Sequence, residues 1–156
     1  MFRRGLAFTA FALTACTEPL PEGQVKTEQG IAQGVSSDGL TKYLGIEYAS
    51  AERWKLPSDG PAWEGVKTFD SFGPACPQRD QEVMLEDCLF LNIFTPEGAS
   101  AEDKLPVMVW IHGGSHQSGA GSQSIYQANQ LVANGVVLVT INYRLGVFGY
   151  IAHPAL

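Results

Sequence analysis

A run of glycines follows one of the most apolar segments of the chain. Residues 107–112 read Val-Met-Val-Trp-Ile-His, and the loop behind them carries Gly113, Gly114, Gly119 and Gly121 without a Lys, Arg, Asp or Glu. Glycine lets the backbone adopt positive φ and approach a bound molecule closely, and successive exposed N–H groups can converge on a negatively charged oxygen. The loop is therefore a candidate for main-chain recognition of an anion or an oxyanion.

Three interpretations of this loop compete. A phosphate-binding loop needs Gly-x-x-x-x-Gly-Lys-Ser/Thr or Gly-x-Gly-x-x-Gly, and Gly-Gly-Ser-His-Gln from Gly113 fits neither pattern and has no lysine. An oxyanion hole supplies backbone donors to the negative oxygen that forms when a nucleophile adds to an ester carbonyl. A tight turn that uses glycines for packing is the third. The residues of the loop alone leave the last two open.

The segments on either side of the loop must position it. Residues 107–111 are apolar throughout, which is typical of a central strand covered on both faces. Residues 124–134 have apolar positions at helical spacing with Gly135 just beyond as a cap, and 136–141 is a second apolar strand. Strand, glycine loop, helix and strand form a βαβ unit with parallel neighbours. Ligand sites of such sheets lie at the carboxyl ends of the strands, where this loop begins.

The first half of the chain reads as sheet followed by irregular structure. Residues 25–35 and 40–49 are rich in strand formers and flank a turn sequence at 36–39, which predicts a hairpin. From 51 to 81 there is little periodicity, and the four large aromatic residues must be buried by packing; they are Trp54, Trp63, Phe69 and Phe72. Residues 88–95 predict another strand, ended by a proline.

Four segments carry motifs that recur together in one family. They read Gly-Ile-Glu-Tyr-Ala (45–49), Glu-Asp-Cys-Leu-Phe-Leu-Asn-Ile-Phe-Thr-Pro (86–96), Leu-Pro-Val-Met-Val-Trp-Ile-His-Gly-Gly (105–114) and Asn-Tyr-Arg-Leu-Gly-Val-Phe-Gly-Tyr (142–150). In this order they resemble the type B carboxylesterases, the α/β-hydrolase family that includes the cholinesterases. The resemblance implies an α/β fold: the amino-terminal part of an α/β-hydrolase, a β-hairpin and then an incomplete, mostly parallel central sheet.

The resemblance also implies roles for single residues. The backbone N–H groups of Gly114 and Ser115 correspond to the oxyanion donors, with Gly113 shaping the loop. Serine replaces the commoner glycine at 115, and we expect it to be tolerated provided that φ there is negative. The family pattern pairs Arg53 with Glu86 and Cys76 with Cys88. Residues 77–87 hold no aromatic side chain, whereas cholinesterases place a tryptophan there, so a choline-type substrate is not supported.

The amino terminus predicts export. Two arginines precede an apolar run that ends at Ala15, too short to span a bilayer and typical of a secretory signal (1–15). Leu-Thr-Ala-Cys at 13–16 resembles a bacterial lipobox, with Cys16 as the acylated residue; an ordinary signal with an incidental cysteine is the alternative. Residues 16–24 predict a tether and 25–156 the hydrolase portion. We expect a lipid-anchored protein, periplasmic or at the cell surface, or otherwise a secreted one.

Export and composition limit the partners. In an oxidising compartment Cys76 and Cys88, twelve positions apart, favour a disulfide over a metal site. The formal charge is −6, and without Arg3 and Arg4 eight basic residues face 16 acidic ones, which argues against nucleic acid. We expect no metal or cofactor, a small-molecule ester as substrate, and a membrane contact through Cys16.

The nucleophile of such a hydrolase is not found in the 156 residues. No serine has glycines two positions before and two after it, as a Gly-x-Ser-x-Gly elbow requires. Ser115 or Ser118 beside His116 does not form a credible substitute, because nothing evident orients the histidine. We expect an esterase fragment that lacks nucleophile, acid and histidine and is inactive alone. A non-catalytic adhesion protein on the same fold and a complete small lipoprotein are the alternatives.

Overall fold

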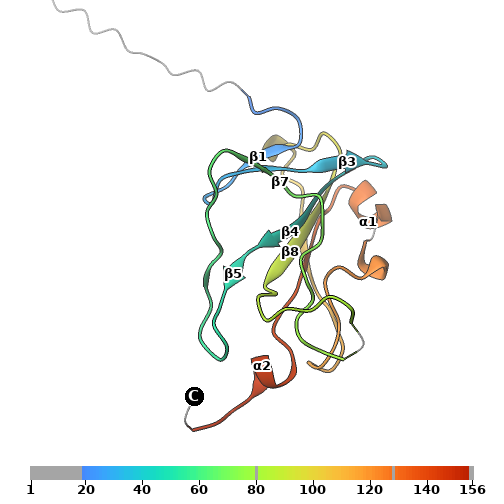
Figure 1. Cartoon of the computed structure of the whole chain (residues 1–156). Helices are drawn as coiled ribbons and strands as arrows, with labels where there is room; N and C mark the ends of the chain where they lie inside the picture. The colour runs from blue at the N-terminus through green and yellow to red at the C-terminus, as the bar shows by residue number, and fades with distance from the viewer. Residues whose placement is uncertain (1–18, 80, 128, 155–156) are drawn as a thin grey trace, which may run out of the picture.

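The computed structural model describes residues 19–79, 81–127 and 129–154. The expected signal peptide and Cys16 lie outside these residues. In Figure 1 two sheets follow one another down the molecule: a small one at the end that holds β1 and β7, and a larger one through its middle, with helix α1 on one side and α2 at the opposite end.

The larger sheet carries the candidate site. Its strands are β3 (Val35–Ser37), β4 (Leu40–Glu47), β8 (Phe90–Pro96), β9 (Val107–Ile111) and β10 (Val137–Ile141), in the spatial order β3-β4-β8-β10-β9. Pairing is antiparallel except between β9 and β10, which run parallel with Val137 opposite Val107. The parallel pair is the one that the βαβ pattern predicted. The expectation of a mostly parallel sheet does not hold among the described strands, because β9–β10 is the one parallel pairing of the larger sheet there.

The amino-terminal segment differs in detail from a single hairpin. β3 and β4 form the predicted hairpin, and Asp38 and Gly39 at its turn both have positive φ. The preceding residues split into β1 (Gln24–Lys26) and β2 (Ile31–Gln33), which join β7 (Val66–Thr68) in a separate three-stranded sheet. β1 begins inside the segment expected to be a tether, because Gln24 pairs with Gln33. A short pair, β5 (Ala49–Ser50) and β6 (Ser58–Asp59), completes the strands.

The helices are short. The 3₁₀ turns η1 (Ala101–Asp103) and η2 (Ser124–Tyr126) flank the site strands, and the α-helices are α1 (Asn129–Ala133) and α2 (Gly146–Tyr150). The helix expected over 124–134 is thus broken into η2 and α1. Gly135 has φ +81°, the left-handed cap conformation that the sequence predicted.

The core lies against both faces of the larger sheet. One buried cluster joins α1 to the sheet through Val132, Leu40, Phe94 and Leu138. Two others are centred on the cysteine pair (Ala49, Cys76, Cys88, Leu89, Leu145) and on Phe69 (Ala32, Tyr43, Phe69). Of the four aromatic residues expected to be buried, Phe69 is buried and Trp63 packs beside it, whereas Trp54 and Phe72 are 42% and 37% exposed. The prediction was wrong for these two.

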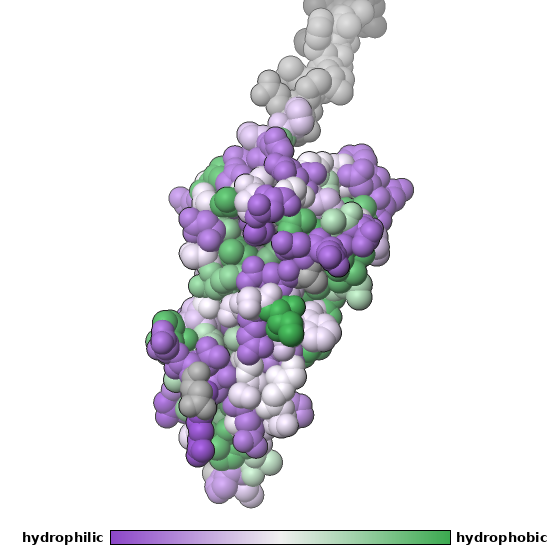
Figure 2. Space-filling view, turned by 90° about the vertical axis from the view of Figure 1, so that its right-hand side faces the viewer, coloured by the Kyte–Doolittle hydropathy of each residue, from purple (hydrophilic) through white to green (hydrophobic). Residues whose placement is uncertain are grey.

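β9 also departs from expectation. It was predicted to be a central strand covered on both sides, but within the described residues it is the outer strand, and all five of its side chains are exposed. Apolar residues on both faces of a strand predict that both faces are covered. The exposure of the strand depends on which neighbouring strands and helices are present beside it. On the face of the molecule shown in Figure 2, hydrophilic residues gather over the end nearer β1 and β3, and hydrophobic residues are scattered among them elsewhere.

Candidate active site

The glycine loop leaves the carboxyl end of β9 and turns sharply. Gly114 has φ +119°, Ser115 φ +53° and His116 φ +59°. A Cβ on Gly114 would lie 1.9 Å from the Ser118 carbonyl oxygen, so only glycine fits there. Serine at 115 was expected to be tolerated provided that φ there is negative, and this condition is not met. Its left-handed conformation costs about 1–2 kcal/mol for a residue with a Cβ, and the turn imposes it.

The main-chain amides of this turn divide into two groups. The Gly114 carbonyl accepts hydrogen bonds from the N–H groups of Gln117 (2.9 Å) and Ser118 (3.1 Å), which closes the turn. Among the described residues, the N–H groups of Gly114 and Ser115 donate to no carbonyl or side chain. Backbone donors left unsatisfied at such a position are available to a bound oxygen atom.

His112 supports the start of the loop. Its ring is buried, its Nδ1 lies 2.8 Å from the Gly113 carbonyl oxygen, and it stacks on Tyr143 with ring centres 4.5 Å apart. The Tyr143 hydroxyl donates to the His112 carbonyl at 2.9 Å. Burial raises the pKa of Tyr143, so this hydroxyl stays protonated and able to donate at neutral pH. His112 thus holds the start of the loop through its ring and its carbonyl group.

Two carboxamides hold the rest of the loop. Asn142, buried just after β10, accepts from the Gly121 N–H (2.8 Å) and donates to the Pro74 carbonyl (3.0 Å). Gln78 accepts from the Gly119 N–H (2.7 Å) and donates to the Gly119 carbonyl (2.8 Å). Neither residue was singled out from the sequence. The available signal was their position: Asn142 opens the last family motif, and Gln78 lies two residues after Cys76.

The loop borders two hollows. A shallow one of about 380 Å³ is lined by Ser115, Gly113, His116 and the ring of Tyr143, among others. A larger open cleft of about 1280 Å³ lies between the loop, residues 77–79 and α2. His116 stacks on Tyr150 across the shared wall, with ring centres 4.4 Å apart. Ser115 lines both hollows.

No local serine–histidine pair assembles in this loop. Among the described residues, neither Ser115 nor Ser118 forms a hydrogen bond with the ring of His112 or His116, whose ring contacts are with Tyr143 and Tyr150. The described residues also contain no group of three or more His, Cys, Asp or Glu side chains arranged to hold a metal ion. Nor is any helix in the described part of the chain long and apolar enough to cross a bilayer.

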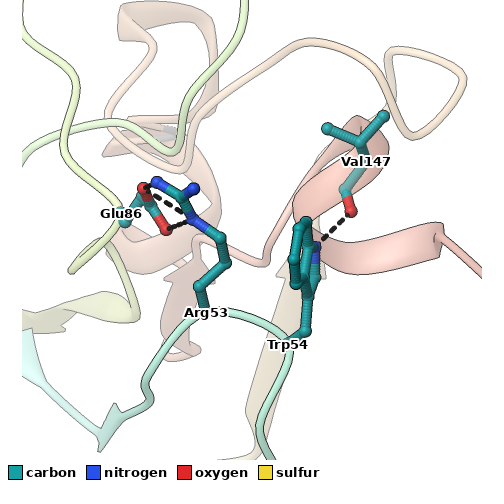
Figure 3. Close-up of polar contacts among 4 residues, drawn as sticks. All are labelled: Arg53, Trp54, Glu86 and Val147. Carbon is teal, nitrogen blue, oxygen red and sulfur yellow. Dashed lines mark hydrogen bonds and ion pairs between the residues drawn. The ribbon is translucent and has the colours of Figure 1, made fainter. Parts of the chain in front are cut away.

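The structure brings both expected pairs together outside the loop. Cys76 and Cys88 form a buried disulfide with Cα atoms 4.9 Å apart. Arg53 forms a bidentate ion pair with Glu86, in which Arg53 Nε lies 2.8 and 3.1 Å from the two carboxylate oxygens (Figure 3). The hydrogen bonds from Arg53 lower the pKa of the Glu86 carboxyl. Beside it, Trp54 Nε1 donates to the Val147 carbonyl of α2 at 3.0 Å.

Fold and loop together define the class of protein. A sheet with a parallel pair at its edge, a glycine loop at the end of one parallel strand and a helix packed behind it are the amino-terminal part of an α/β-hydrolase, as predicted. Solved structures confirm this fold: PNB esterase superposes with a TM-score of 0.78 at 40% identity over 86% of the chain and 29% of its own. An esterase from Clostridium hathewayi that can hydrolyse aliphatic aromatic polyesters gives 0.76 at 37% identity, over 83% and 28%.

The chain belongs to the carboxylesterase family, whose family model matches residues 21–154. It is 40% identical to the para-nitrobenzyl esterase of Bacillus subtilis (strain 168) over 81% of its length, and 36% identical to the fumonisin B1 esterase of Sphingopyxis macrogoltabida over 97%. It spans 28% and 29% of the lengths of these two relatives.

Proposed function

We propose that this chain is the oxyanion-binding part of a carboxylic ester hydrolase that works through a serine acyl-enzyme. The observation that carries the proposal is the pair of N–H groups at Gly114 and Ser115, which have no partner among the described residues, beside a hollow lined by Ser115. Membership of the carboxylesterase family supports it. The two amides would donate to the oxygen that becomes negative as the ester carbonyl turns tetrahedral.

The reaction divides between this chain and groups that its sequence does not contain. Acyl transfer needs a nucleophilic serine, a histidine base and an acid, and the 156 residues hold no Gly-x-Ser-x-Gly elbow. What this chain contributes is stabilisation of charge on the carbonyl oxygen. We therefore propose that the 156-residue polypeptide alone does not hydrolyse esters.

Small neutral or anionic esters fit the site better than choline esters. The cleft beside the loop is lined by Arg79 and His116, and the described residues that line it include no carboxylate. Residues 77–87 provide no aromatic face for a quaternary ammonium group. The related para-nitrobenzyl and fumonisin B1 esterases are named for ester substrates, which supports a small-molecule ester rather than an adhesion partner.

The decisive experiment compares two proteins. The first is the product of the whole reading frame that carries this chain, and the second is the 156-residue polypeptide. Each is assayed for hydrolysis of p-nitrophenyl acetate. Each is also treated with a labelled fluorophosphonate, which modifies activated serines. We expect turnover and labelling of the first and neither in the second. Absence of both in a folded first protein contradicts the esterase proposal, and a burst of product from the second contradicts its inactivity.

We also propose that residues 1–15 direct export and that Cys16 carries a lipid anchor at the periplasmic or outer face of a membrane. The lipobox-like segment 13–16 supports this. In a bacterial host, incorporation of labelled palmitate that disappears in Cys16→Ser is the expected result. Secretion of unlabelled wild-type protein into the medium indicates an ordinary cleaved signal instead.

A further inference from the structure

One side chain ties the disulfide loop to the glycine loop. Gln78 uses both ends of its carboxamide on Gly119: Oε1 accepts from the Gly119 N–H at 2.7 Å, and Nε2 donates to the Gly119 carbonyl at 2.8 Å. Nε2 also donates to the carbonyl of Cys76 at 3.0 Å. The three hydrogen bonds leave this side chain one orientation.

Gly119, at the end of the turn, lies against His112 and Gly113 at its start. It has φ +114°, and a Cβ built on it would lie 2.3 Å from His112 Nδ1 and 2.7 Å from the Gly113 carbonyl oxygen. The main chain at 119 is therefore in direct contact with the residues that lead into Gly114 and Ser115. A displacement of Gly119 would be transmitted to those two amides through this contact.

We call the three hydrogen bonds of the Gln78 side chain the clamp. The clamp joins Gly119 to the segment that carries Cys76, and this segment is rigid. Cys76 is buried and bonded to Cys88, which lies two residues before the first residue of the central strand β8. The Gln78 N–H faces the sulfur of Met84 at 3.3 Å, and Ala75 forms a β-bridge with Met84. The segment 75–78 is thus fixed at both ends and can act as an anchor for the loop.

We propose that Gln78 is a positioning residue for ester hydrolysis: it holds Gly119, and through Gly119 the Gly114 and Ser115 amides, at a fixed place relative to the disulfide. The inference rests on the proposed role of those amides as an oxyanion hole. It assigns Gln78 no contact with the substrate. Its effect is therefore on kcat, because the geometry of the donors matters most in the transition state.

The first test follows the loop itself. Amide hydrogen exchange of Gly119 is measured by NMR in the wild-type chain, in Gln78→Ala and in the control Gln130→Ala, whose side chain is exposed on α1. We expect Gly119 to exchange at least about tenfold faster in Gln78→Ala and unchanged in the control, since only the first loses its acceptor. Equal protection of Gly119 in all three overturns the clamp.

The second test reads catalysis in the product of the whole reading frame. Gln78→Ala should lower kcat by about tenfold with KM within about twofold, less than the 10²- to 10³-fold typical of losing a donor outright. An unchanged kcat in an active enzyme overturns the positioning role. If the wild-type enzyme is inactive but the amide of Gly119 still exchanges faster in Gln78→Ala, the proposed esterase function is contradicted. The hydrogen bonds from Gln78 to Gly119 are then supported independently of that function.

A third variant, Gln78→Glu, distinguishes a loss of positioning from a general loss of structure. It also replaces Gln78→Ala in the test if the alanine variant does not fold. Its carboxylate can accept from the Gly119 N–H but cannot donate to the Gly119 and Cys76 carbonyls. Once protonated it donates again, so the ratio of variant to wild-type kcat should rise as pH falls towards the ordinary carboxyl pKa of about 4.3. A ratio that stays flat from pH 8 down to about pH 4, where most of the carboxyl is protonated, contradicts the proposal.

Discussion

Tyr143 and His112 are joined twice, once through their stacked rings and once through the hydrogen bond from the tyrosine hydroxyl to the histidine carbonyl. Tyr143 lies just after β10 and His112 just after β9, so both contacts fix the start of the glycine loop to the segment that follows the neighbouring parallel strand. Tyr143→Phe keeps the ring and removes the hydroxyl. We expect it to lower the free energy of unfolding by about 1 kcal/mol, as measured by urea denaturation.

Tyr143→Leu serves as the companion variant, because it removes the stacked pair as well. An aromatic pair contributes about 0.5–1.5 kcal/mol beyond its buried area, so the leucine variant should be the less stable of the two. Equal stability of wild type and Tyr143→Phe would show that the hydroxyl contributes nothing to holding His112.

Ser115 stores backbone strain that glycine would relieve. Its φ of +53° is costly for a residue with a Cβ, whereas glycine adopts it freely but loses more entropy on folding. We expect Ser115→Gly to raise the free energy of unfolding by about 0.5 kcal/mol and Ser115→Val to lower it by more than 1 kcal/mol. Thermal unfolding of the three proteins checks the order, and a glycine variant less stable than wild type contradicts it.

The disulfide should account for a large share of stability. Linking positions twelve apart restricts the unfolded chain by about 3 kcal/mol in the loop-entropy description. Reduction should therefore lower the urea midpoint clearly, with Cys16→Ser introduced in every sample to exclude intermolecular bonds. The control is the Cys76→Ala/Cys88→Ala double variant, whose midpoint should not respond to reductant. A wild-type midpoint that reductant leaves in place would rule out this contribution.

The Arg53–Glu86 pair predicts a pH dependence with a definite sign. Hydrogen bonding to Arg53 lowers the pKa of Glu86 below 4.5, its ordinary value. A carboxyl with a lowered folded-state pKa adds stability above its unfolded pKa and loses that stability as pH falls through the folded one. The difference in stability between wild type and Glu86→Gln should accordingly shrink from pH 6 to pH 3.

The same pair can be followed directly by NMR titration of the Glu86 carboxyl carbon. Arg53→Gln should move its pKa upward towards 4.5, while Lys42→Gln, whose ammonium group pairs with Asp38, should leave it in place. A Glu86 titration that Arg53→Gln does not alter would show that the contact has no energetic consequence in solution. Because both side chains are partly exposed to solvent, salt should weaken the effect.

Local patterns in the sequence were sufficient for much of the fold. The hairpin turn at Asp38 and Gly39, the strands at 90–96, 107–111 and 137–141 and the cap at Gly135 all follow from residues close together in the chain. The predicted single helix over 124–134 was wrong, because helical spacing of apolar residues does not require the backbone to continue unbroken from Ser124 to Asn134.

The candidate site was predictable only in part, for a physical reason. Gly114 and Ser115 could be placed from a motif of adjacent residues. The contacts that hold them join positions such as Gln78 and Gly119, or Asn142 and Pro74, which are 41 and 68 residues apart. Polar side chains that bond to distant main-chain groups carry no periodic signal. The left-handed φ of Ser115 likewise results from the closure of the turn and not from the identity of serine.

The outer edge of β9, which is unpaired among the described residues, favours self-association of the polypeptide. Five consecutive apolar side chains flank a row of peptide groups with no strand beside them in the described chain, which makes a template for pairing between molecules. Self-association should therefore grow with concentration, and a lysine at Val109 would act as a gatekeeper against it.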